Sequence, residues 1–166
     1  MAQNRALRQR AHGKSPIEIT LIPLVTKLIW LHLFLTSLVL IAGTIVTGSG
    51  PHAGDSAAER FNLDSRTMAW IHADLVIALL GVSIALVIAI RLGLTGQARQ
   101  VLSGRIQIFL IVAFAQGCIG YIQYFTKLPE ALVAAHIIGS IAVWLSAWNL
   151  FISSNLGANL IARKGL

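Results

Sequence analysis

Two histidines, His72 and His136, are the residues of this chain whose type and position could do chemistry. Both lie inside long apolar runs, where an ionisable side chain is costly and usually serves a function. A neutral imidazole is a good iron ligand, and two imidazoles can hold one iron from opposite sides. The pair therefore indicates a site for a flat metal macrocycle such as haem. Interhelical hydrogen bonding and a proton path remain as alternatives.

Long segments without charged residues must position these histidines. No Asp, Glu, Lys or Arg occurs in the 27 residues between Lys27 and Asp55, in the 21 between Arg105 and Lys127, or in the 32 between Glu130 and Arg163. A hydrocarbon core of about 30 Å needs roughly 20 apolar helical residues. The sequence thus predicts an all-α membrane protein, a four-transmembrane-helix bundle. Its expected spans are residues 24–47, 67–90, 106–125 and 130–151.

Three segments follow from these spans. Residues 1–23 form a basic tail that we expect to be disordered, residues 24–152 form the four-helix haem-binding domain, and residues 153–166 form a C-terminal tail. Of the 13 Lys and Arg residues, ten fall on the side that holds both tails, which the positive-inside rule makes cytoplasmic. We expect a multi-pass protein of the cell membrane, in a prokaryote the plasma membrane.

The composition excludes several classes of protein. The chain is 56% hydrophobic and only 11% charged, which is too few charges for the surface of a soluble enzyme or a nucleic-acid binder. We attribute its net charge of +7 to the Lys and Arg residues on the cytoplasmic side of the predicted spans. We therefore expect a lipid bilayer as partner and no nucleic acid. Cys118, its one cysteine, allows no intrachain disulfide and no four-cysteine iron–sulfur site. No phosphate-binding loop or hydrolase motif occurs.

The histidines differ in their expected depth in the membrane. At 1.5 Å per residue, His72 and His136 lie about 8 Å and about 10 Å inside the outer boundary, on two spans that run in the same direction. His32 lies deeper, roughly 18 Å from the outer face, so we expect a structural role for it. His52 falls in the outer loop, where it is either solvent-exposed or in contact with a ligand edge.

Three further residues are weaker candidates for haem contacts. Arg66 and Lys127 fall at the outer boundary, where haem carboxylates would emerge, although both could be snorkelling anchors. Gly139 follows His136 by about one turn and could leave room for a flat ligand, although close helix packing explains such a small residue equally well.

Several runs around these histidines resemble the haem A synthase (heme A synthase) family. They are GTIVTGSGPHAGD at 43–55, HAD at 72–74, QGCIGYIQY at 116–124, LPE at 128–130 and His136. The resemblance covers about 27–151 and one half of a family member, the C-terminal four-helix half, because members usually have eight spans in two similar halves. It implies a role in the oxidation of haem O to haem A for cytochrome c oxidase biogenesis, with His72 and His136 as axial ligands of haem iron.

Two differences from the family concern its other, substrate-binding half. Residues 68 and 69, four and three positions before His72, are Met and Ala where that half has a Glu, and the loop 48–66 has no cysteine. The resemblance therefore implies the haem b cofactor half of an oxidoreductase and assigns no catalytic residue in this chain. It implies a homo-oligomer or a separate N-terminal-type half as partner, and haem O synthase or an electron donor as a further one.

Two other classes of function fit the same residues. One is a bis-histidine b-type cytochrome subunit that only transfers electrons. The other is a haem-free membrane scaffold or small transporter, which would lose no cofactor on losing both histidines.

Overall fold

The computed structural model describes residues 16–50 and 59–163, and the side chains of 23–50 and 59–154. These ranges form four long helices and no strand: α2 (Pro16–Ser49), α3 (Ser65–Gly93), α4 (Gly96–Phe125) and α5 (Glu130–Arg163). Each contains a stretch long and apolar enough to cross a membrane. The prediction of an all-α bundle with four candidate spans is therefore confirmed.

The helices extend further than the expected spans. The candidate spans are Pro23–Ser49, Ser65–Gly93, Gly96–Phe125 and Glu130–Ser154. α2 begins at Pro16, within the expected N-terminal tail, and α5 continues to Arg163, through most of the expected C-terminal tail. A helix need not end where its hydrophobic stretch ends, because backbone hydrogen bonding continues until a cap or turn stops it. Residues 1–15, which we expect to be disordered, and His52, which we expect in the outer loop, lie outside the described residues.

Local chemistry sets the helix ends near the candidate site. The Asp64 carboxylate accepts hydrogen bonds from Thr67 N–H (2.8 Å) and from the Thr67 hydroxyl (2.6 Å), which caps the start of α3. These two bonds hold the pKa of Asp64 below its usual range, and Arg66 adds to the effect. Between α4 and α5, Lys127 and Leu128 adopt positive φ angles of 63° and 59°, which reverses the chain before Pro129.

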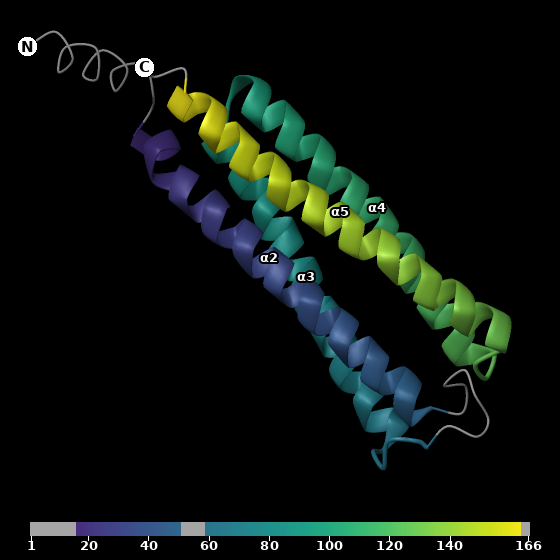
Figure 1. Cartoon of the computed structure of the whole chain (residues 1–166). Helices are drawn as coiled ribbons and strands as arrows, with labels where there is room; N and C mark the ends of the chain where they lie inside the picture. The colour runs from purple at the N-terminus through teal and green to yellow at the C-terminus, as the bar shows by residue number, and fades with distance from the viewer. Residues whose placement is uncertain (1–15, 51–58, 164–166) are drawn as a thin grey trace, which may run out of the picture.

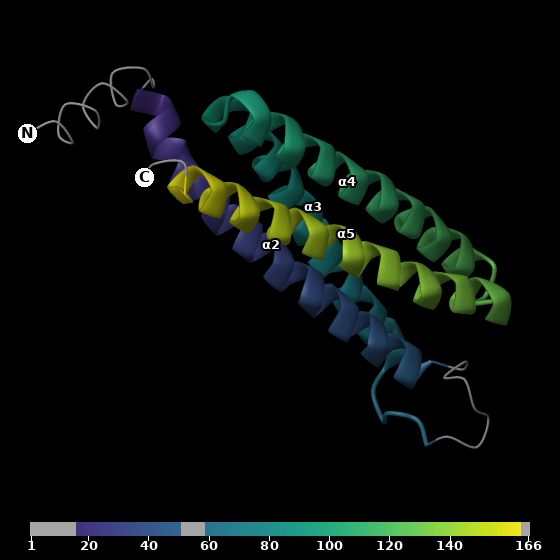
Figure 2. The same cartoon turned by 45° about the horizontal axis from the view of Figure 1, so that its top comes forward.

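The four helices pack as two antiparallel hairpins, α2 with α3 and α4 with α5 (Figures 1 and 2). Helices α2 and α5 are in contact, as are α3 and α4, and these contacts join the hairpins into one bundle. The start of α2 and the end of α5 lie at the same end of the bundle (Figure 1). The connection between α2 and α3 and the turn between α4 and α5 lie at the other end.

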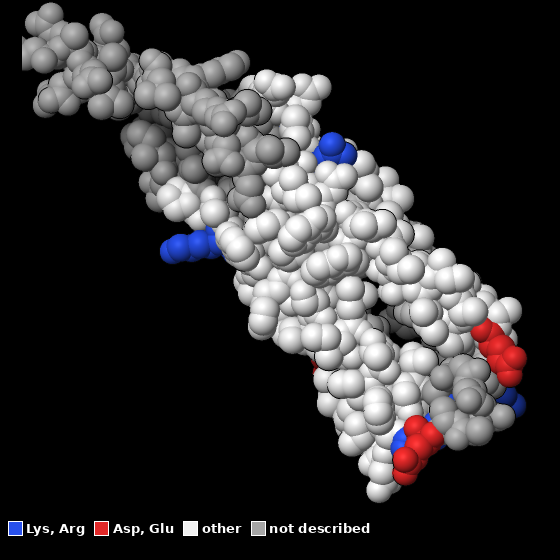
Figure 3. Space-filling model, viewed as in Figure 1, with Lys and Arg blue, Asp and Glu red and all other residues white. Residues whose placement is uncertain are grey.

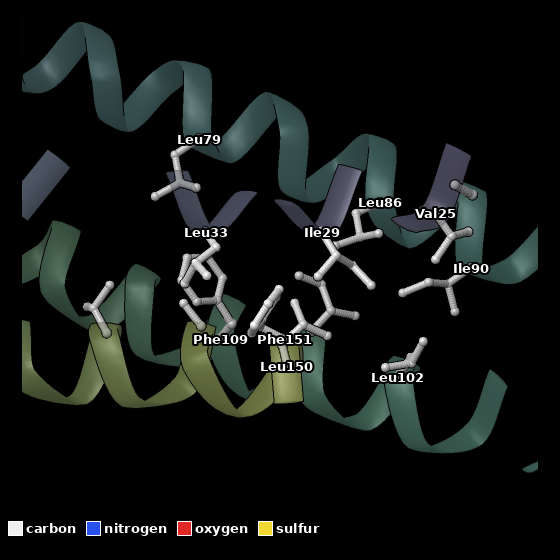
Figure 4. Packing of buried hydrophobic residues seen from close by; sticks show 14 of the residues in the cluster. Val25, Ile29, Leu33, Leu79, Leu86, Ile90, Leu102, Phe109, Leu150 and Phe151 are labelled. Carbon is white, nitrogen blue, oxygen red and sulfur yellow. The ribbon is translucent and has the colours of Figure 1, made fainter. Parts of the chain in front are cut away.

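The buried side chains gather in one half of the bundle, which we call the closed half. It consists of residues 25–39, 79–93, 102–116 and 143–151. Leu86, Ile90 and Leu150 are fully enclosed there, and Phe109 is almost so (Figure 4). The other half, which we call the open half, consists of residues 40–49, 65–78, 117–125 and 130–142, and none of its side chains is buried.

The surface is typical of a protein surrounded by lipid. Large apolar side chains are exposed along all four helices, for example Ile77, Phe114 and Ile138. The face seen in Figure 3 is nearly free of charge between its two ends. Trp70 and Tyr121 are exposed toward one end of the bundle and Trp30 and Trp148 toward the other, which matches the aromatic belts of membrane proteins.

We expect Leu86→Ala to destabilise the bundle by roughly 2 kcal/mol, the low end of the range for Leu→Ala in cores. Lipid is as apolar as leucine, so the substitution loses packing but little hydrophobic transfer energy. Leu80→Ala on the same helix is the control, because Leu80 is 48% exposed. Thermal unfolding in detergent measures both variants, and equal melting temperatures would contradict the assignment of the closed half as the core.

Candidate functional site

His72 is held between α3 and α2. Its Nδ1 lies 3.0 Å from the carbonyl oxygen of Val39, so Nδ1–H can donate to that oxygen. A Cβ atom placed on Gly43 would lie 3.2 Å from Cε1 of the ring. Gly43 follows Val39 by one helical turn, so both lie on the face of α2 that meets the imidazole. The backbone of α2 thus supplies both the space for the ring and its hydrogen-bond acceptor.

His136 occupies a matching position between α5 and α4. A Cβ atom placed on Gly120 would lie 3.3 Å from Cε1 of its ring. The Nε2 amide of Gln116 donates to the backbone carbonyl oxygen of His136 (3.2 Å). Unlike Nδ1 of His72, Nδ1 of His136 is buried without a hydrogen-bond partner among the described residues.

The two imidazoles belong to different hairpins but to the same end of the bundle. His72 is seven residues after the start of α3, and His136 is six residues after the start of α5. Both side chains are partly exposed, and neither Nε2 makes a hydrogen bond with the residues that the structure describes. His72 and His136 therefore both lie in the open half, one on each hairpin.

The space between the hairpins is incompletely filled in this half. Figure 3 shows a hollow between the α2 side and the α5 side of the bundle, beyond the closed half. No buried side chain from any helix fills this region. A shallow pocket lined by Gln100, Gly104 and Arg105 lies near the opposite end of α4 and is separate from the histidines.

The weaker site candidates have distinct surroundings. The open side of Gly139 is covered by the side-chain amide of Gln116, which a Cβ atom at residue 139 would overlap. Gly139 therefore permits the Gln116 contact with α5, and haem contact by Gly139 stays a prediction. Arg66 and Lys127 are both exposed at the end of the open half that lies away from the closed half, and their contact with haem carboxylates also stays a prediction.

His32 lies in the closed half, away from this pair. It is 1% exposed, and its ring meets Phe109 edge to face at a centroid distance of 4.2 Å. Its Nε2 is buried without a partner among the described residues. This packing agrees with the structural role expected from its depth.

Sequence reasoning missed the residues that hold the two rings. Gly43 and Gly120 fall within the runs used for the resemblance, but neither was assigned to a histidine. Their partners are 29 and 16 residues away, so only the register of each antiparallel hairpin identifies them. The Val39 carbonyl oxygen carries no signal in the sequence, because every residue has such an oxygen.

The donor set is suited to a macrocycle and not to a bare metal ion. Within the described residues, no group of three or more His, Cys, Asp or Glu side chains converges on one point. A metalloporphyrin needs only one or two axial ligands from the protein, because its ring supplies four nitrogens. Each imidazole lies against a glycine of the neighbouring helix, Gly43 or Gly120, and contact of either ring with a macrocycle stays a prediction.

Comparison with known proteins identifies no relative: no family model matches the chain. No curated protein and no solved structure matches it either.

We expect Gly120→Leu to destabilise the protein by about 1–3 kcal/mol, because the new side chain must displace the ring of His136. Gly117→Leu is the matched control on the same helix, since a Cβ atom there meets nothing within 4 Å. Both changes improve helix propensity equally, so the difference in melting temperature in detergent isolates the contact. A Gly120→Leu protein as stable as Gly117→Leu would contradict the placement of the ring.

Proposed function

We propose that this chain is a haem-binding membrane protein and that His72 and His136 are the axial ligands of a haem b. The observation that carries the proposal is the pair of imidazoles in the open half, one from each hairpin, each lying against a glycine of the neighbouring helix. Imidazole nitrogens in such surroundings need partners, and haem iron would provide one for each ring.

The chain's own groups account for how the ligands would be oriented. The Val39 carbonyl oxygen can accept the Nδ1 proton of His72, which would leave Nε2 unprotonated, as a metal ligand must be. Gly43 and Gly120 let the rings lie close to the neighbouring helices. A haem held by both histidines would supply one-electron transfer, because its iron would have no position left for oxygen. Arg66 and Lys127 would face the haem carboxylates, and Gly139 would lie beside the ligand of α5.

The motif resemblance supports a more specific proposal. We assign the chain to the haem A synthase family as its haem b cofactor half, acting in the conversion of haem O to haem A. Met68 and Ala69 precede His72 where the substrate half has a Glu, so this chain would not be sufficient alone. It would act with a second copy or a separate N-terminal-type half, and with haem O synthase or an electron donor.

The topology belongs to the same proposal. Both helix ends that carry the tails lie at one end of the bundle, and the excess of Lys and Arg on that side favours a cytoplasmic location. The open half would then face the outer surface of a prokaryotic plasma membrane. Its haem would be accessible to partners on that side.

The absorption spectrum of the purified protein tests haem binding. Protein produced with ample haem should show the reduced α and Soret bands of a bis-imidazole b haem. His72→Ala and His136→Ala should each lose these bands, because each removes one axial ligand. His32→Leu is the control, since His32 lies in the closed half, and it should retain them. A colourless wild-type protein would exclude haem binding and favour the haem-free scaffold.

A second candidate is a bis-histidine cytochrome that only transfers electrons, and the Met68–Ala69 pair in place of a Glu favours it. Supplying haem O to membranes that contain the chain, alone and with a separate N-terminal-type half, distinguishes the two. Haem A detected by chromatography is expected only with the second half or with an oligomer of this chain. A haem-containing protein that yields no haem A under either condition would be an electron-transfer subunit.

A further inference from the structure

Three polar side-chain atoms in the α4–α5 hairpin are buried without hydrogen-bond partners among the described residues. They are Oε1 of Gln116, Oε1 of Gln123 and Nδ1 of His136. An unpaired polar atom in an apolar environment destabilises the state in which it occurs. Two unpaired acceptors and one potential donor in the same hairpin therefore indicate a hydrogen bond that forms only in another state of the protein.

Gly120 defines where these groups lie relative to one another. The ring of His136 rests on Gly120, with Nδ1 at 3.8 Å from a Cβ atom placed there. Gln123 is three residues after Gly120 and Gln116 is four before it, so both glutamines share the face of α4 that meets the ring. The imidazole thus lies between two glutamines, one on each side along the helix.

The direction of helical side chains selects Gln123 as the partner. Side chains lean toward the N-terminus of their helix, so Gln123 leans back over Gly120 and the imidazole. The Nε2 of Gln116 donates to the carbonyl oxygen of His136, which fixes this side chain over Gly139, with its Oε1 at 3.3 Å from a Cβ atom placed there. The backbone of Gln123 is held in place, because its carbonyl oxygen accepts a hydrogen bond of 2.7 Å from Leu128 N–H.

We infer that Gln123 is the positioning residue for His136, with its Oε1 accepting the Nδ1 proton when Nε2 binds iron. This inference rests on the proposed haem site. Metal binding at Nε2 leaves the ring proton on Nδ1, which makes Nδ1 a donor in need of an acceptor. Gln123 then does for His136 what the Val39 carbonyl oxygen does for His72.

The two proposed ligands therefore differ in whether a substitution can change the hydrogen-bond acceptor behind the imidazole. The acceptor behind His72 is a backbone atom that substitution does not remove, whereas the acceptor behind His136 is a side chain. A stronger acceptor makes the imidazole a more electron-rich ligand and stabilises ferric over ferrous iron. Gln123 is thus the position from which the reduction potential of this haem can be adjusted.

The test compares the purified full-length haem proteins Gln123→Leu, Gln123→Glu and Gln107→Leu with the wild type. Gln107 is an exposed glutamine near the opposite end of α4, so Gln107→Leu controls for loss of an amide from this helix. We expect Gln123→Leu to bind haem about 10- to 100-fold more weakly, the usual effect of losing a partner behind a metal ligand. Its reduction potential should rise, that of Gln123→Glu should fall, and Gln107→Leu should match the wild type in both properties.

The outcomes separate the two proposals. A wild-type protein without haem overturns the haem site and the role of Gln123 together. A wild type with a bis-imidazole spectrum, but with Gln123→Leu and Gln123→Glu both at its potential and haem affinity, overturns the positioning role alone. If Gln123→Leu does not fold, the isosteric Gln123→Glu decides: a lowered potential supports the inference, and an unchanged or raised potential overturns it.

Discussion

The contact between an imidazole and a facing glycine is the constraint on which the open half depends. Among helices surrounded by lipid, association comes from close packing, because lipid tails are as apolar as the side chains themselves. In the closed half, interlocking side chains such as Leu86, Phe109 and Leu150 provide that packing. In the open half none of the side chains is buried, and the rings of His72 and His136 lie directly on Gly43 and Gly120.

Two different kinds of interface follow from this division. The closed half holds all four helices together, so it positions the two hairpins relative to each other. The open half keeps each hairpin closely paired but leaves a hollow between them (Figure 3). The side chains that hold the four helices together are therefore separate from the region that carries the two imidazoles, one on each hairpin.

The repeated glycine contact makes the two hairpins alike, and their hydrogen bonds make them different. His72 has a backbone acceptor at Nδ1, whereas Nδ1 of His136 has none among the described residues. An unpaired buried nitrogen destabilises the fold in which it is seen, and such a cost is typically tolerated where a functional state removes it. The asymmetry therefore distinguishes His136 as the imidazole whose Nδ1 still lacks an acceptor among the described residues.

The sequence by itself determined the four helical spans, because long apolar runs with at most one charged residue each have few stable alternatives in a bilayer. It also determined the two histidines of interest, since their distance from the span ends can be counted along the chain. Only the tertiary structure decided that Gly43 faces His72, that Gly120 faces His136, and that Gln116 covers Gly139. These contacts depend on the register and rotation of antiparallel helices, which side-chain packing sets between residues far apart in the chain. Hydrophobic pattern alone carries no such information in a helix that is apolar on every side.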